Sequence, residues 1–178
     1  LIAWRSPGLL HTDAPALGML SAVLSLGQSA PLHSKLVLGG LATSTGALVM
    51  EQDFTLRSPG LFMVESALQA DVTAEQALAM VDALLNDQLE ELRGGRAAEA
   101  LERARNLTQV GFYNGVRSNM GLARQLASYI TATGDPLYGQ HLLERMRTVT
   151  EEEVGGVLER YLLTAPRLVV AQRPGAAE

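Results

Sequence analysis

The residues best suited to metal chemistry are the three histidines His11, His33 and His141. Only His141 is followed by an acid, Glu144, at the spacing of a known zinc motif. The run His141-Leu142-Leu143-Glu144-Arg145 comes close to His-x-x-Glu-His, a helical pattern in which two histidines bind zinc and the glutamate acts as general base. Its last position is Arg145, and a guanidinium offers no lone pair to a metal at neutral pH. Zinc needs three or four protein ligands. We therefore predict no catalytic residue and no metal site in this chain.

The chain also lacks the residues that other kinds of catalytic site require. The chain has no cysteine, which excludes disulfides, thiolate zinc sites and cysteine nucleophiles, and which fits the cytoplasm and the periplasm equally. Its glycine pairs, such as Gly39-Gly40, do not match the phosphate-binding pattern Gly-x-Gly-x-x-Gly. We therefore predict no cofactor. An unrelated enzyme with a cleft between helices remains an alternative, and no cluster of His, Asp and Ser favours it.

Length and composition indicate a globular domain. The chain has 178 residues, of which 47% are hydrophobic and 19% are charged. The formal net charge of -5 disfavours nucleic acid as a partner, because phosphate contacts need clustered Lys and Arg. No apolar run approaches the ~18 residues that span a bilayer. The chain begins at Leu1 inside an apolar run, so we expect a piece of a longer polypeptide.

The elements that would position any site can be read from turn residues and hydrophobic spacing. Asp13 is expected to cap a helix that ends at Gly27, and a second short helix should precede Gly39-Gly40. Capping boxes at Thr73 and Thr150 predict two further helix starts. The remaining expected elements are strands at Leu1–Trp4, Ala47–Phe54, Leu61–Leu68 and Arg167–Arg173, with a turn at Ser58-Pro59-Gly60, and helices within 97–133 (interrupted near Gly111) and 136–147.

This order predicts the fold class. A β-α-β-β-α-α-α-α-β chain with a hairpin cannot form an all-parallel sheet. We expect an α+β fold of two layers, with a mostly antiparallel sheet of about four or more strands and the helices packed on one face.

A set of short motifs in fixed order carries a family resemblance. The chain shows Pro7, Asp13-Ala14-Pro15-Ala16-Leu17, Leu26-Gly27, Gly60-Leu61-Phe62, Gly134-Asp135-Pro136, Val149-Thr150-Glu151-Glu152-Glu153-Val154 and Tyr161-Leu162. Together they make nearly the whole chain resemble the C-terminal, non-catalytic domain of insulinase-type (pitrilysin-type, or mitochondrial-processing-peptidase-like) zinc metallopeptidases. The same resemblance implies the metallopeptidase-like fold predicted above.

The resemblance also singles out two positions that flank a loop. In substrate-binding members a Leu-Arg opens this loop, and a Leu-Ala-Tyr or Leu-Gly-Tyr closes it. Here Leu36 is followed by Val37, and Leu41-Ala42 is followed by Thr43. A threonine cannot replace a cationic fork that pairs a carboxylate. We therefore predict that the substrate-holding pair is substituted at Val37 and Thr43, the alternative being a locally different alignment.

The resemblance implies a role that depends on partners. Residues 1–178 would form one domain, the non-catalytic C-terminal half of a longer peptidase-like chain. This half would pack against its own N-terminal catalytic domain, which would carry the zinc, and would help to enclose peptide substrate. Some bacterial members place the Arg/Tyr pair on a second homologous subunit, which is a further expected partner. The alternative is a structural or assembly subunit of the same fold without a proteolytic role.

One aromatic pair has two expected roles. Phe112 and Tyr113 lie in a helical region, where their apolar bulk predicts either core packing or contacts between domains.

Overall fold

The computed structural model describes residues 1–50 and 60–172. In chain order the elements are β1 (Ile2–Ser6), α1 (Ala14–Ser25), η1 (His33–Val37), β2 (Ala42–Val49), β3 (Gly60–Leu68), α2 (Ala74–Arg93), α3 (Ala98–Val116), α4 (Asn119–Thr133), α5 (Tyr138–Thr148), α6 (Glu151–Val157), η3 (Leu158–Leu163) and β4 (Arg167–Val169). The elements η1 and η3 are short helices with the wider π-type turn. This succession confirms the α+β class.

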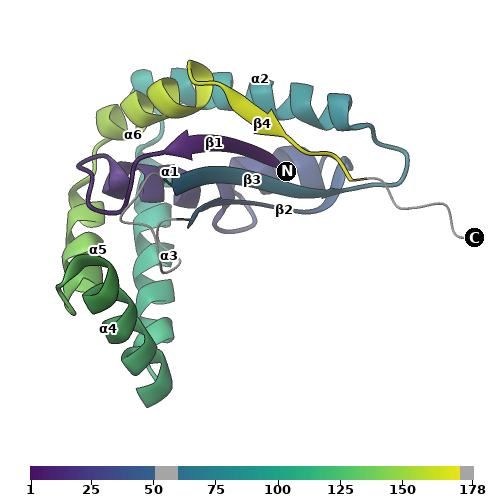
Figure 1. Cartoon of the computed structure of the whole chain (residues 1–178). Helices are drawn as coiled ribbons and strands as arrows, with labels where there is room; N and C mark the ends of the chain where they lie inside the picture. Colours follow the sequence, from purple (N-terminus) through teal and green to yellow (C-terminus); the bar gives the residue numbers. More distant parts are fainter. Residues whose placement is uncertain (51–59, 173–178) are drawn as a thin grey trace, which may run out of the picture.

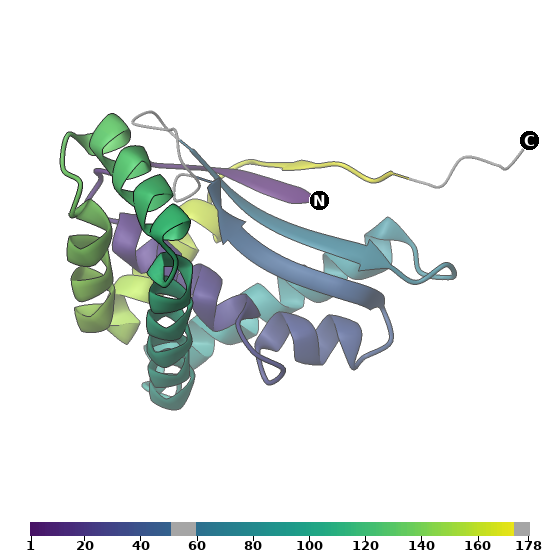
Figure 2. The ribbon, with the colours of Figure 1, turned by 90° about the horizontal axis from the view of Figure 1, so that it is seen from below.

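The four strands form one antiparallel sheet in the order β2-β3-β1-β4. The helices lie on one face of this sheet, as the two perpendicular views show (Figures 1 and 2). The first and last strands are neighbours, and the amino group of Leu1 donates to the Val170 carbonyl at 3.0 Å. The predicted two-layer arrangement is confirmed.

The core fills the space between the sheet and the helices. Trp4 of β1 is paired with Phe62 of β3, so both rings lie on the helix-covered face, where they meet edge to face at a centroid distance of 6.3 Å. Helix α1 runs through the centre of this layer, and its Leu17 and Leu20 are fully buried. Burying large apolar side chains on one face only leaves the other face of the sheet without a helical cover.

Both predicted capping boxes are present. The Thr73 hydroxyl accepts from the Gln76 N–H, and the Gln76 side chain accepts from the Thr73 N–H. Thr150 and Glu153 exchange the same pair of bonds at the start of α6. These bonds satisfy backbone donors that have no partner within the helix, which explains why the helices begin where the sequence predicts.

The first strand of the hairpin lies further toward the N-terminus than its predicted span. It was expected over Ala47–Phe54, whereas β2 spans Ala42–Val49. The hydroxyl of Thr45 donates to the Glu65 carbonyl at 3.1 Å and contacts the Ser66 hydroxyl at 2.8 Å, so polar residues that suggested a loop instead bind the neighbouring strand. The rest of the predicted strand, 51–54, and Ser58-Pro59 of the predicted turn lie outside the described residues.

The long helical stretch breaks at a different residue from the one predicted. Gly111 was expected to interrupt it, but this glycine is exposed within α3 and no break occurs there. The chain instead turns at Ser118, whose hydroxyl accepts from the Gly121 N–H at 3.0 Å and caps α4. A side chain that caps an N-terminal N–H group fixes the start of a helix. A glycine inside a helix only lowers the helix propensity at its own position, so it interrupts the helix less effectively.

Candidate functional site

The two positions predicted to be substituted flank the turn between η1 and β2. Val37 is the half-buried last residue of η1, whereas Thr43 is exposed and lies in β2 rather than in a loop. The Thr43 hydroxyl donates to the Ala67 carbonyl of β3 at 3.2 Å, so its proton is used within the sheet. The preceding Leu36 is fully buried and anchors the turn. Whether these positions correspond to a substrate-holding pair stays a prediction.

The histidines lie in two places. His11 and His141 line a cavity of about 290 Å³ together with Arg145, whereas His33 belongs to η1. The His141 Nδ1 lies 3.0 Å from Asp135 Oδ2, and Arg145 donates to Glu153 Oε1 at 2.5 Å. Over residues 1–50 and 60–172, no group of three or more His, Asp or Glu side chains could hold a metal ion. The zinc that the family resemblance implies therefore has no fitting ligand set in the described part of this chain.

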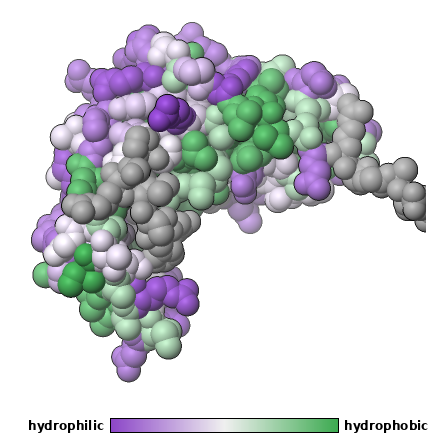
Figure 3. All heavy atoms as spheres, in the orientation of Figure 1, coloured by the Kyte–Doolittle hydropathy of each residue, from purple (hydrophilic) through white to green (hydrophobic). Residues whose placement is uncertain are grey.

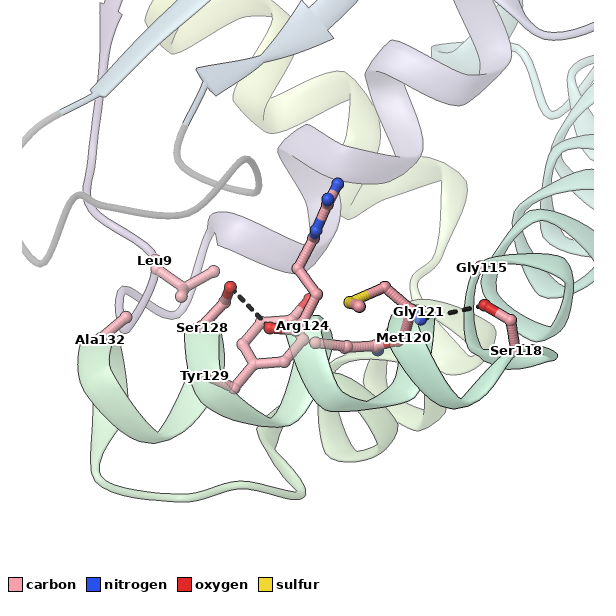
Figure 4. Close-up of a pocket in the computed structure, with 10 residues that line it drawn as sticks. Leu9, Gly115, Ser118, Met120, Gly121, Arg124, Ser128, Tyr129 and Ala132 are labelled. Atoms are coloured by element: carbon pink, nitrogen blue, oxygen red, sulfur yellow. Dashed lines mark hydrogen bonds between the residues drawn. The ribbon is translucent and has the colours of Figure 1, made fainter.

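A larger cavity, of about 450 Å³, opens beside α4 (Figure 4). Leu9, from the segment after β1, forms one wall, and α4 supplies Arg124, Ser128 and Tyr129. Cavities of about 300 to 1,000 Å³ with mostly apolar walls and a few polar groups are typical of small-ligand sites. The described lining residues are Leu9, Gly115, Ser118, Met120, Gly121, Arg124, Gln125, Ser128, Tyr129 and Ala132.

The sequence interpretation missed this cavity. It is built where Leu9 approaches α4 across more than a hundred residues of chain, and no local pattern reports that approach. One signal was available within α4 itself: Arg124 is its only charged residue among fifteen. A surface helix with a single charge is unusual, because the solvent-facing side normally carries several.

A second candidate surface is the uncovered face of the sheet. The register aligns Leu48, Met63, Ala3 and Leu168 in one row across all four strands, on the face opposite Trp4 and Phe62. Leu168 is 63% exposed, and its outer-face neighbours Leu1 and Val170 are 40% and 47% exposed. A hydrophobic patch is visible over the strands in the space-filling view (Figure 3). Ala3 and Met63 in the middle of the row are buried, at 6% and 9% exposure, so the exposed apolar surface lies at the β4 edge of the sheet. An exposed apolar patch of this kind marks an interaction surface.

The aromatic pair lies on α3, and neither ring is among the described residues that line the cavity. The rings of Phe112 and Tyr113 meet edge to face at 5.6 Å, and Tyr113 is 57% exposed on α3. Core packing is therefore excluded for Tyr113, and a contact between domains stays a prediction.

The fold is a two-layer α+β domain with helices on one face of a four-stranded antiparallel sheet. The sequence model of the peptidase M16 inactive domain matches residues 1–108, and the chain belongs to this family. It is thus an inactive peptidase domain of the insulinase-like metallopeptidases, as the resemblance indicated. No curated protein sequence matches the chain.

Solved structures share the fold. A protease from Helicobacter pylori superposes with a TM-score of 0.77 at 20% identity, over 90% of this chain and 37% of its own. The inactive peptidase domain of a candidate zinc protease from Bordetella parapertussis gives 0.73 at 24%, over 99% of this chain and 93% of its own. The peptidase M16 inactive domain from Pseudomonas fluorescens gives 0.71 at 20%, over 97% and 41%. The chain therefore spans little more than a third of the Helicobacter protease.

The helices also bear on whether the chain could cross a membrane. Within residues 1–50 and 60–172, no helix combines the length and the apolar character that crossing a membrane requires.

Proposed function

We propose that residues 1–178 form the non-catalytic C-terminal half of a zinc-dependent peptidase, which packs against the catalytic domain and helps to enclose peptide substrate. The observation that carries this proposal is the exposed apolar patch of Leu168, Leu1 and Val170 on the outer face of the sheet, at its β4 edge. Zinc and the general base belong to the catalytic domain. This half contributes surface rather than chemistry.

The open face has the properties that a chamber wall needs. A sheet backed on one side by helices is rigid, and it presents its other side over a broad area. The exposed side chains Leu168, Leu1 and Val170 gain free energy by leaving water when a peptide lies on them, at about 25 cal/mol per Å² of buried apolar surface. The contact is not specific to one side chain, which suits a surface that receives extended peptides of varied sequence.

The first experiment concerns the parent polypeptide. The reading frame upstream is searched for His-x-x-Glu-His, and the full-length protein is tested for hydrolysis of a mixed peptide library. Zinc-dependent cleavage supports the proposal. A full-length protein with the same fold in both halves, but with no zinc motif and no partner that carries one, would instead support the alternative of a structural or assembly subunit.

A surface variant of the full-length peptidase then tests whether the open face of the sheet contacts substrate. Leu168→Asp places a charge on the open face at a residue that is 63% exposed, so we expect little change in folding stability. Burial of one leucine is worth about 1.5 to 3 kcal/mol, so KM for an apolar peptide should rise about tenfold or more. The matched control is Leu137→Asp, at a residue that is 46% exposed at the start of α5 and off the sheet. Equal kinetics for both variants would show that the open face does not meet substrate.

A further inference from the structure

Independently of the peptidase role, we propose that the cavity beside α4 binds a small ligand that joins an apolar part to a carboxylate. The cavity has a volume of about 450 Å³, which is enough for an aliphatic chain or a short peptide.

The apolar part of the ligand is accommodated by one region of the cavity. Leu9 and the buried Ala132 lie at one end, with the ring of Tyr129 beside them. Met120, which is 73% exposed at the other end of α4, supplies a flexible thioether that can close over a ligand. These groups can contact an aliphatic or aromatic substituent of the ligand on several sides.

The charge of the ligand follows from Arg124. Its guanidinium extends from α4 on the side that faces α1 (Figure 4), and it forms no ion pair with any residue in 1–50 or 60–172. No Asp or Glu occurs among the described lining residues. What sets Arg124 apart from other unpaired arginines is its position, because it is the only Lys or Arg among the described residues that line the cavity.

A carboxylate fits this cation better than a phosphate dianion does. The guanidinium fork matches the two oxygens of one carboxylate, and a single positive charge balances a single negative one. One nearby hydroxyl can assist, because Ser118 accepts from the Gly121 N–H and keeps its own proton to donate to a carboxylate, whereas the Ser128 proton is used by the Arg124 carbonyl at 2.8 Å. The site therefore combines one charged anchor with weak polar support.

Titration calorimetry of the 178-residue chain tests the proposal with four probes. Decanoate and the acid of N-acetyl-Leu-Leu carry the carboxylate, whereas decanol and the amide of N-acetyl-Leu-Leu are their uncharged counterparts. We expect at least one acid to bind with a Kd below about 1 mM, and to bind at least about tenfold more tightly than its counterpart. The tighter of the two acids identifies the source, an aliphatic acid or a peptide C-terminus.

Variants then locate the site. Arg124→Gln should weaken binding of that acid about tenfold or more, because a charge-assisted hydrogen bond is lost, while Arg117→Gln, an exposed arginine outside the cavity lining, should change nothing. Gly115→Leu should weaken binding without altering charge, because a Cβ at this lining position meets open space and the leucine would occupy the cavity. The proposal is overturned if neither acid binds below about 1 mM, if acids and neutral probes bind alike, or if Arg117→Gln matches Arg124→Gln.

Discussion

The Tyr161 hydroxyl donates a hydrogen bond of 2.9 Å to Asp13 Oδ2 and so joins η3 to the start of α1. Arg160 donates to the same oxygen at 2.6 Å. Asp13 was predicted to cap α1, and it does stand at the cap position, but its side chain makes no capping bond. Its carboxylate instead accepts from two donors near the other end of the chain. Pro15 near the start of α1 removes one N–H that would otherwise need a cap.

Removal of the Asp13 carboxylate should therefore loosen the contact between the two ends of the chain. Asp13→Ala eliminates both bonds and leaves the half-buried Tyr161 hydroxyl without this acceptor. We expect a loss of about 1 to 3 kcal/mol in the free energy of unfolding, measured by urea denaturation. Asp71→Ala, at an exposed carboxylate, is the matched control and should lie within about 0.5 kcal/mol of the wild type. Equal losses for both variants would contradict a specific role for Asp13.

The capping box of α6 should make stability depend on acid. The Thr150 N–H donates to Glu153 Oε2 at 2.8 Å, and this bond holds the pKa of Glu153 below its usual value, with desolvation opposing it and Arg145 adding to it. Because the pKa is lower in the folded chain, the stabilisation is complete above the unfolded pKa and is lost as pH falls through the folded one. Glu153→Gln keeps an acceptor for the cap but cannot titrate.

Denaturation at a series of pH values checks this expectation. The free energy of unfolding of the wild type should fall more steeply between about pH 5 and pH 3 than that of Glu153→Gln. Glu152→Gln, in the same helical turn and exposed, should keep the wild-type slope. If Glu153→Gln is as acid-sensitive as the wild type, the cap carboxylate does not contribute to the pH dependence.

Two glycines of the α3–α4 region should respond to alanine in opposite directions. A Cβ at Gly111 meets nothing within 4 Å in the middle of α3, so Gly111→Ala should stabilise the chain by about 0.5 to 1 kcal/mol. A Cβ at Gly121 would overlap the Gly115 carbonyl oxygen, so Gly121→Ala should destabilise it. Thermal denaturation of the two variants measures whether each substitution raises or lowers Tm. A rise in Tm for Gly121→Ala would show that the turn before α4 relaxes easily.

Local chemistry explains why much of the fold could be predicted. Capping boxes at Thr73 and Thr150 lie within four residues of chain, and the motif itself specifies their bonds. The hairpin between β2 and β3 forces antiparallel pairing whatever its exact register. The same locality explains the confirmed order of elements and the placement of helices on one face of the sheet.

Features made by distant segments could not be predicted in this way. The start of β2 depends on threonine bonds to β3, which a loop-like run of small polar residues conceals. The cavity requires Leu9 to approach α4, and the apolar row requires β4 to pair with β1. At the end of β4 and just beyond it, the run Leu168-Val169-Val170 is apolar at every position, so no alternation indicates which side chain faces outward.

The proposal that zinc and catalysis belong to a separate domain makes a direct prediction for the isolated 178-residue chain. It should retain no stoichiometric zinc after dialysis and should hydrolyse no peptide. The nearest approach to a site is the cavity with His11 and His141, but Arg145 also lines it, and its positive charge would repel a cation. Elemental analysis and a quenched-fluorescent peptide mixture measure the two properties, with the full-length protein as the control. One tightly held zinc per isolated chain would overturn the assignment of metal chemistry to a separate catalytic domain.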